Sequence, residues 1–339
     1  MLNVEWLRLT AFNIQHSTFN IISMLLDVRN LTTEFTTPEG ARLRAVEGVS
    51  FTLGRGEALG IVGESGCGKT TAMLSLLRLL PAAGRVVAGE VLFAGDDLLR
   101  LTPAELRERR WRDLSIVFQG AMNALNPVRS VGDQIREAIL AHMPWPRDKV
   151  GARVSELLEL VGIPAWRAAQ FPHQYSGGMR QRAMIAMALA CNPQLVVADE
   201  PTTALDVMVQ AQIIDLLDRL RRDLDLAMII VTHDLGVVAE ACQQVLVMYG
   251  GRVAEHGPVE RVFAAPRHPY TQMLLKAFPT IEHRGAPMVG IPGSPPRLSD
   301  LPAGCRFHPR CPLAVERCRV ETPEPRAVGE GHVAACHLV

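Results

Sequence analysis

The sequence predicts an α/β protein whose core is a parallel sheet covered by helices on both faces. Three short apolar runs, Ala58–Val62, Leu195–Asp199 and Met228–Thr232, are separated by stretches with helical periodicity. Strands that alternate with helices favour a parallel sheet buried on both sides. The segment Gln119–Ala190 has helical periodicity and almost no strand pattern, so we expect it to form a helical subdomain inserted into the core.

Length and composition narrow the class of protein. The 339 residues exceed the usual size of a single core, and 48% hydrophobic with 21% charged residues is typical of a globular chain. The 35 basic and 35 acidic residues cancel, so the chain lacks the long-range attraction to phosphate backbones that a nucleic-acid partner would require. No apolar run approaches the roughly 18 residues of a transmembrane helix, so we expect any membrane role to depend on partner chains.

Residues Met1–Ser23 have neither the basic start nor the small-residue cleavage site of a secretory signal. A strand-like pattern begins just after Met24, which makes this methionine an alternative start. We therefore expect an optional N-terminal extension, with a start-site artefact as the other reading, and a cytoplasmic protein.

Before the first apolar run, the sequence predicts an antiparallel edge sheet. Leu26–Leu31 and Ala45–Phe51 read as strands separated by the turn-like Thr37–Gly40. After that run, we expect a glycine-rich loop, a helix over about Lys69–Leu79 and a strand pair around Gly89–Ala94.

The later elements follow the same alternation. Helical periodicity marks two segments of the inserted subdomain and an amphipathic stretch between the last two apolar runs. A Gly250-Gly251 turn joins two further strands, and Pro and Gly accumulate from Pro279 onward, which predicts a linker and a small, loop-rich tail. The expected helices are Val131–His142, Gly151–Val161, Met208–Leu224, Val259–Ala264 and Pro269–Lys276.

The segment Gly63–Thr70 matches the P-loop pattern and lies between a buried strand and a helix, where phosphate binding requires it. Its glycines let backbone N–H groups turn toward phosphate oxygens, Lys69 reaches the β and γ phosphates, and Thr70 offers its hydroxyl to Mg²⁺. The alternative is a merely structural glycine loop, in which Cys67 is a tolerated small residue. The predicted nucleotide contacts are Gly63, Glu64, Ser65, Gly66, Cys67, Gly68, Lys69, Thr70 and Thr71.

Asp199, Glu200 and His233 follow two predicted strands, at the edge of the sheet where open α/β folds bind ligands. We expect Asp199 to hold Mg²⁺ and Glu200 to polarise the attacking water. If the two strands are neighbours, His233 reaches the γ-phosphate or that water. The alternative is that all three are capping or solvated residues.

Two further features lie at the ends of the inserted helices. Gln119 follows the strand Ser115–Phe118 and is either a residue that couples the domains or a plain polar strand end. Ser176-Gly177-Gly178 opens the helix Met179–Ala190, so its hydroxyl and N–H groups form either a second anion-binding site or an ordinary cap.

Together these motifs resemble an ABC-transporter ATPase, over about Met24–Pro266. The resemblance implies the P-loop NTPase fold of an ABC nucleotide-binding domain, with ATP and Mg²⁺ bound. It also implies a composite site, in which the P-loop of one subunit is closed by Ser176-Gly177-Gly178 of another. The motifs that carry it are the P-loop, Gln119, Tyr175–Gln181, Asp199-Glu200, Ala204–Asp206 and Thr232–Asp234.

The resemblance also assigns roles to single residues. Tyr175 and Met179 replace the Leu and Gln of the commonest signature, but the serine and glycines are intact, so we expect a competent site. The implied roles are Glu200 as catalytic base, His233 as switch histidine, Gln119 as a catalytic-site residue that contacts the membrane subunits, Asp206 as a contact across the dimer, Phe35 as the adenine-stacking aromatic, and Thr70, Gln119 and Asp199 as Mg²⁺ ligands.

Three segments, Phe118–Pro127, Ser176–Arg182 and His268–Thr271, are similar to the dipeptide and oligopeptide importer branch of this family. The branch implies a peripheral subunit on the cytoplasmic face of the membrane that energises peptide uptake. It would work with a second ATPase, which is often a different sister chain, two permease subunits and an extracytoplasmic binding protein. The alternatives are an importer of nickel or another small solute, a soluble non-transport ABC ATPase, and a regulatory binder that does not turn over.

The tail carries four of the seven cysteines. On chemistry alone, four thiolates suit Zn²⁺ or an iron–sulfur cluster equally. Resemblance to the cysteine-bearing extension of the importer branch implies a [4Fe–4S] cluster, with zinc second and free thiols third. The predicted ligands are Cys305, Cys311, Cys318 and Cys336. His308, His332 and His337 are alternative ligands, but we expect them to be surface residues.

The sequence thus predicts three units. Residues 1–23 are the N-terminal extension. Residues 24–265 are the nucleotide-binding domain, with the helical subdomain at about 120–190. Residues 266–339 are a C-terminal extension of the peptide-importer type.

Overall fold

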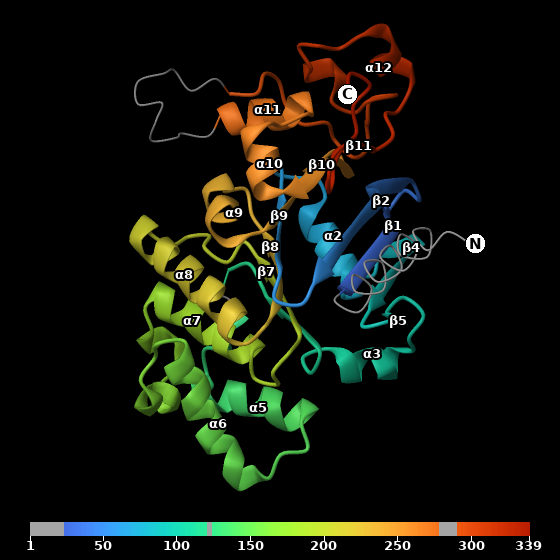
Figure 1. Cartoon of the computed structure of the whole chain (residues 1–339). Coiled ribbons are helices and arrows are strands. Elements are labelled where there is room, and N and C mark those ends of the chain that lie inside the picture. Colours follow the sequence, from blue (N-terminus) through green and yellow to red (C-terminus); the bar gives the residue numbers. More distant parts are fainter. Residues whose placement is uncertain (1–23, 121–123, 278–289) are drawn as a thin grey trace, which may run out of the picture.

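The computed structural model describes residues 24–120, 124–277 and 290–339 (Figure 1). The predicted extension Met1–Ser23 lies outside these residues, and so does the middle of the segment Phe118–Pro127.

The expected edge sheet is present, and its strands are longer than the sequence indicated. It has four strands in the order β2-β1-β4-β5, all antiparallel. A hydrogen-bonded turn from Thr37 to Ala41 joins the first two strands. The strands are β1 (Met24–Thr36), β2 (Arg42–Gly54), β4 (Gly84–Phe93) and β5 (Asp96–Asp97).

The main sheet has eight strands, in the order β11-β12-β10-β9-β3-β8-β7-β6. The five strands from β9 to β6 are parallel, as predicted, and β10, β12 and β11 continue the sheet in antiparallel pairing. The strands are β3 (Ala58–Val62), β6 (Leu114–Val117), β7 (Leu195–Asp199), β8 (Ala227–Val231), β9 (Gln244–Tyr249), β10 (Arg252–Pro258), β11 (Arg326–Gly329) and β12 (His332–Ala334).

Helices cover both faces of this sheet (Figure 1). On β7, Leu195 and Val197 pack with the edge sheet and α2, whereas Val196 and Ala198 pack with the other helices. This alternation is the period-2 pattern of a strand buried on both sides. The helices are α2 (Lys69–Leu76), α3 (Pro103–Arg109), α5 (Val131–His142), α6 (Arg147–Leu160), α7 (Gly177–Ala188), α8 (Val207–Asp223), α9 (Leu235–Ala241), α10 (Val259–Ala264), α11 (Pro269–Lys276) and α12 (Glu316–Val320).

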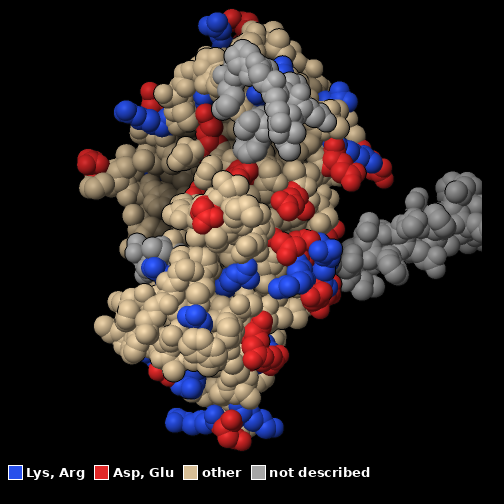
Figure 2. Space-filling model, turned by 90° about the vertical axis from the view of Figure 1, so that its left-hand side faces the viewer, with Lys and Arg blue, Asp and Glu red and all other residues tan. Residues whose placement is uncertain are grey.

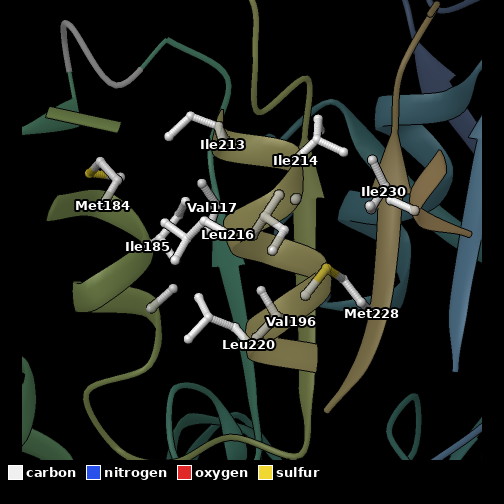
Figure 3. Packing of buried hydrophobic residues seen from close by; sticks show 14 of the residues in the cluster. Val117, Met184, Ile185, Val196, Ile213, Ile214, Leu216, Leu220, Met228 and Ile230 are labelled. Carbon is white, nitrogen blue, oxygen red and sulfur yellow. The ribbon is translucent and has the colours of Figure 1, made fainter. Parts of the chain in front are cut away.

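Helix α8 packs beside α7 and against the strands of the main sheet (Figure 3). Its apolar side chains Ile213, Leu216 and Leu220 are at most 1% exposed and share a cluster with Ile185 of α7 and Val196 of β7. Each such buried side chain contributes about 1.5–3 kcal/mol relative to exposure to water. This packing fixes the start of α7 relative to the strands that carry the acidic residues.

Local chemistry sets the ends of the helices. α5 begins where predicted because the Ser130 hydroxyl accepts a hydrogen bond from Asp133 N and caps it. α2 ends at Leu76, three residues earlier than expected, and Arg78 soon after adopts a left-handed φ of 50° that a helix cannot continue.

The tail returns to the main sheet. Its strand β12 pairs with β10 through Glu255 opposite Ala334 and His256 opposite Val333. This pairing places the C-terminal residues beside the main sheet, and the sequence did not indicate it.

The surface agrees with the neutral net charge. On the face that Figure 2 shows, acidic and basic side chains are interspersed and most of the surface is neither. In the described part of the chain, no helix is both long and apolar enough to cross a membrane.

Candidate active site

The predicted P-loop runs from the end of β3 into α2. Its lysine is 7% exposed and folds back onto the loop. Lys69 Nζ donates to the carbonyl oxygens of Gly63 at 2.7 Å and Glu64 at 3.1 Å. The ammonium group thus lies inside the loop, bound to the loop's own carbonyl groups.

Glycine is required where the loop meets its neighbours. Gly68 has a φ of +104°, and a Cβ there would lie 2.5 Å from the carbonyl oxygen of Ala45. A side chain at this position would force either the edge sheet or the helix start to move. The close approach keeps the N-terminal N–H groups of α2 uncovered beside the loop.

Asp199, at the end of β7, faces the start of α2. The Thr70 hydroxyl donates to Asp199 Oδ1 at 3.4 Å, and Asp199 is 3% exposed. Burial raises the pKa of the Asp199 carboxyl above its ordinary value, and the nearby charge of Glu200 adds to the rise. A cation beside this pair of oxygens would offset that burial.

Glu200 is the point where several predicted residues meet. Its carboxylate accepts hydrogen bonds from Gln119 Nε2 at 2.7 Å and from the Thr203 hydroxyl at 2.7 Å, and lies 3.3 Å from His233 Nδ1. The structure brings Gln119 and His233 to Glu200 because β6, β7 and β8 are adjacent parallel strands whose carboxyl ends share one edge.

The backbone of Glu200 has a conformation that is uncommon for a residue other than glycine. Its φ is +45°, in the left-handed region, and its N–H donates to the carbonyl of Val231 at 2.8 Å. Non-glycine residues in this conformation cost about 1–3 kcal/mol and cluster at functional sites. The sharp turn after β7 aims the carboxylate across the sheet edge.

The predicted Ser176-Gly177-Gly178 site lies at the start of α7, away from the P-loop of the same chain. Ser176 is exposed and its hydroxyl accepts a hydrogen bond from Met179 N at 3.3 Å, so it caps its own helix. α7 and α2 pack on opposite faces of the sheet, so within one chain this helix start does not face the P-loop. Gly178 packs tightly, since a Cβ there would lie 2.6 Å from Val209 Cγ1.

Two other predicted residues have structural contacts in this chain. Asp206 caps α8 by accepting from Val209 N at 3.0 Å. Phe35 lies near the end of β1, half-buried, with its ring over Gly84. Their assigned roles across a dimer and against adenine stay predictions.

The iron–sulfur prediction is wrong, and so is the zinc alternative. Within residues 24–120, 124–277 and 290–339, the structure holds no group of three or more His, Cys, Asp or Glu side chains placed to bind a metal ion. Burial raises the pKa of the Cys305 thiol to about 11, and the neighbouring thiols Cys318, Cys336 and Cys311 add to the rise. Burial therefore opposes ionisation of Cys305, one of the four predicted ligands.

The substitute histidines are engaged otherwise. His308 Nδ1 lies 2.9 Å from the Cys305 carbonyl oxygen, and His337 Nε2 lies 2.8 Å from that of Glu321. His332 Nε2 lies 2.7 Å from the buried Glu255 carboxylate.

Sequence reasoning missed Thr203 and three residues near the P-loop, Tyr249, Tyr270 and Arg310. Thr203 lies three residues after Glu200, at a spacing typical of a turn, which was the available signal. Tyr270 lies in a segment already noted for its resemblance to importers. No local pattern indicated Arg310, because its contacts are with residues far away in the sequence.

Comparison with known families identifies two regions. Residues 46–203 match the family described as ABC transporter. Residues 254–318 match the family described as oligopeptide/dipeptide transporter, C-terminal region.

Curated proteins are similar over nearly the whole chain. The oligopeptide transport ATP-binding protein OppD of Haemophilus influenzae is 46% identical over 93% of this chain and 97% of its own. The dipeptide transport ATP-binding proteins DppD of Bacillus subtilis and Escherichia coli are 46% and 45% identical, over 93% and 92% of this chain and 94% and 96% of theirs. These names describe ATP binding and peptide transport and mention no metal cluster.

Solved structures of ATP-binding cassettes share the fold. The cassette MJ0796, in a dimeric post-hydrolysis state bound to ADP and Pi, has a TM-score of 0.62 at 26% identity, covering 69% of this chain and 99% of that one. CbiO1 of Clostridium perfringens, part of the transporter complex cbiONQ, has a TM-score of 0.62 at 30% identity, covering 72% of this chain and 92% of that one.

Proposed function

The chain belongs to the ATP-binding subunits of ABC transporters, in the oligopeptide and dipeptide branch, and from this premise we propose that it hydrolyses ATP to energise peptide import. The observation that carries the proposal is the Glu200 carboxylate. Gln119 and Thr203 hold it at 2.7 Å each and His233 lies 3.3 Å away, beside the Thr70–Asp199 pair.

Glu200 is the proposed catalytic base. A general base has to lie within hydrogen-bond reach of the water from which it takes a proton. Hydrogen bonds from Gln119 and Thr203 hold Glu200 Oε2, and Oε1 is the atom near His233. His233, whose side chain is 68% exposed, is the proposed contact to the γ-phosphate side.

The phosphates would lie in the P-loop and at the start of α2. Lys69 would exchange its two neutral carbonyl acceptors for negatively charged β- and γ-phosphate oxygens, so that both donor and acceptor are ionised. Thr70 and Asp199 are hard oxygen ligands of the kind that Mg²⁺ takes together with phosphate oxygens, and Gln119 lies at the same edge. Bound there, the ion would neutralise charge on the transferred phosphate.

The proposed site is completed by a second ATPase subunit. Ser176-Gly177-Gly178 and the P-loop lie on opposite faces of the sheet in one chain, so the exposed Ser176 is available to a facing subunit. The similar cassette MJ0796 has a dimeric structure, which supports pairing of two such subunits. One chain alone is expected to hydrolyse ATP poorly, and Asp206 and Phe35 keep their proposed contacts, across the dimer and to adenine.

The proposed partners are two membrane permeases and a second ATPase, which we take to be a sister chain, with an extracytoplasmic peptide-binding protein acting through the permeases. The position of the chain is then peripheral, on the cytoplasmic face of the membrane. We assign ATP binding to residues 24–265, with the helical subdomain at about 120–190 facing the permeases. Phe118, which is 41% exposed beside Gln119, supports a contact there.

A Glu200→Gln variant tests the catalytic assignment in the assembled transporter. ATP binding should be retained, because the amide keeps the size and hydrogen bonds of the side chain, while hydrolysis should fall by roughly 10²- to 10⁴-fold with the loss of the base. Glu240→Gln, a change to an exposed carboxylate on α9, is the matched control and should leave both unchanged. Near-normal hydrolysis by Glu200→Gln would remove the proposed base.

Uptake by the same reconstituted transporter tests the cargo. Dipeptides and oligopeptides should be taken up in an ATP-dependent way that Glu200→Gln abolishes. Uptake of nickel with none of any peptide would contradict the peptide assignment but keep the ATPase.

A further inference from the structure

Two residues from beyond the family-matched ATPase segment contact the P-loop at a single residue, Glu64. Tyr270 of α11 bonds to its backbone, and Arg310 of the tail bonds to its carboxylate. Neither contact takes part in the chemistry proposed above.

Tyr270 contacts the P-loop from a position that hydrogen bonds connect to strand β10. Its side chain is 0% exposed, and its hydroxyl accepts a hydrogen bond from Glu64 N at 2.9 Å. His268 caps α11 by accepting from Tyr270 N at 3.0 Å, and the His268 N–H is itself held by the buried Glu255 carboxylate at 2.9 Å. The position of the hydroxyl is thus fixed by two successive hydrogen bonds from the core strand β10.

The peptide group that Tyr270 holds is the one that binds the lysine. Glu64 N–H and Gly63 C=O belong to the same planar unit and point in opposite directions. The carbonyl accepts from Lys69 Nζ at 2.7 Å, while the N–H donates to Tyr270. A shift of Tyr270 would therefore rotate the peptide against which the lysine rests.

Arg310 holds the side chain of the same residue. Its guanidinium donates to both carboxylate oxygens of Glu64, at 2.6 and 2.9 Å, in a bidentate pair. The Arg310 side chain is only 6% exposed, and its other N–H groups donate to the Pro292 carbonyl at 2.7 Å and the Tyr249 hydroxyl at 3.2 Å. Since a buried charge left without its partner is costly, the pair fixes the tail against the loop.

The aromatic residues around this pair are packed together. The ring of Tyr249 lies 4.6 Å from that of Tyr270 and 5.1 Å from that of Phe307, which is 1% exposed. The tail segment that carries Arg310 is therefore anchored to the core by burial as well as by charge.

We propose that Tyr270 and Arg310 are positioning residues that set the P-loop for ATP by holding Glu64, so that the C-terminal segment is part of the nucleotide site. The inference rests on the proposed ATP binding. It adds that the segment matched to the oligopeptide/dipeptide C-terminal region contributes to nucleotide affinity, and not only to the fold.

ATP binding by the purified full-length chain tests the inference. Arg310→Met, which keeps an unbranched apolar side chain but removes the guanidinium, should weaken the Kd for ATP by about 10-fold or more, as expected for losing a charged hydrogen-bonded partner. Tyr270→Phe removes one oxygen atom and should weaken it by about 3- to 10-fold. Arg310→Lys should recover part of the loss.

Two control experiments distinguish an effect on the position of the P-loop from an effect on the stability of the fold. Arg317→Met, in the same tail, removes only a half-exposed pair with Glu321 and should leave the Kd unchanged. In a Glu64→Gln background, Arg310→Met should have little further effect, because the carboxylate it holds is already gone.

The melting temperature and the Kd for ATP together distinguish the possible outcomes. If the wild-type chain binds ATP, and Arg310→Met and Tyr270→Phe lower the melting temperature but bind ATP as tightly as wild type, the contacts with Glu64 are only structural and the inference is overturned. If Arg310→Met does not fold, Tyr270→Phe decides alone. A wild-type chain that does not bind ATP would instead sink the proposed function.

Discussion

The P-loop and the start of α7 are built from the same local parts, a glycine-bearing turn followed by a helix N-terminus, but the rest of the chain treats them differently. The P-loop is held by its own lysine, by Tyr270 and by Arg310. Ser176 is exposed and caps only its own helix. The P-loop is therefore positioned by contacts within the chain, and we call it the organised half of the proposed site. The start of α7 is exposed, and we call it the outward half.

The largest effect is expected at the organised half. Lys69→Ala removes the group that would bind the β and γ phosphates, so ATP affinity of the isolated chain should fall by roughly 10- to 100-fold, the effect of losing a charge-assisted hydrogen bond. Calorimetric titration with ATP and Mg²⁺ measures it. Lys149→Ala, at an exposed position on α6, should bind ATP like wild type. If Lys69→Ala bound ATP as tightly as the wild-type chain, Lys69 would not be a phosphate contact, and the P-loop would not be the organised half of the site.

A smaller effect on stability, with none on ATP affinity, is expected at the outward half. In Gly178→Ala the new methyl group meets Val209 Cγ1, and the free energy of unfolding should fall by about 1 kcal/mol. Urea unfolding measures the change, and Val209→Ala in the same chain should reverse it.

Gly151→Ala is the matched control on α6, where a Cβ meets nothing within 4 Å. It should raise the free energy of unfolding by about 0.5–1 kcal/mol, because alanine is the better helix former. A loss of ATP affinity in isolated Gly178→Ala would mean that the two halves are coupled within one chain.

A dependence of stability on pH is expected at a second contact of the tail with the core. Burial opposes ionisation of Glu47, but the hydrogen bond from Arg252 and the charges of Arg306, Arg252 and Arg44 outweigh it and lower its pKa to about 2. In the unfolded chain the pKa is about 4.3. Ionised Glu47 therefore stabilises the fold above about pH 4.3, and this contribution is lost as the pH falls toward 2.

The stability difference between wild type and Glu47→Gln, measured by urea unfolding, should accordingly shrink between pH 5 and pH 3. If this difference stayed constant over the range, the pKa of the Glu47 carboxyl would not be lowered by its arginine contacts as described. Arg310 would then be the main charged contact between the tail and the core.

Much of this molecule was predictable because its signals are local. The buried strand Ala58–Val62 and the helices Val131–His142 and Pro269–Lys276 have the predicted bounds, since their ends are set by turns and caps within the same segment. The prediction for His233 depended on β7 and β8 being neighbours, and they are. The contact of His233 with the γ-phosphate or the attacking water stays a prediction.

Other features were decided by contacts between distant residues. The pairing of β12 with β10 depends on backbone groups that carry no sequence pattern of their own. The four cysteines crowded in the tail suggested a metal site, yet closeness along the chain does not determine how side chains converge, and among the described residues they form no metal-binding group.

By itself the sequence determined the alternation of strands and helices, the glycine-rich loop with its lysine, and the acidic residues at the strand ends, because hydrophobic periodicity and turn chemistry act within a few residues. Only the tertiary structure decided that Tyr270 and Arg310, 206 and 246 residues away from Glu64, meet the loop at that residue. Their hydrogen bonds depend on how the sheet, α11 and the tail pack, and no short segment of the chain encodes that arrangement.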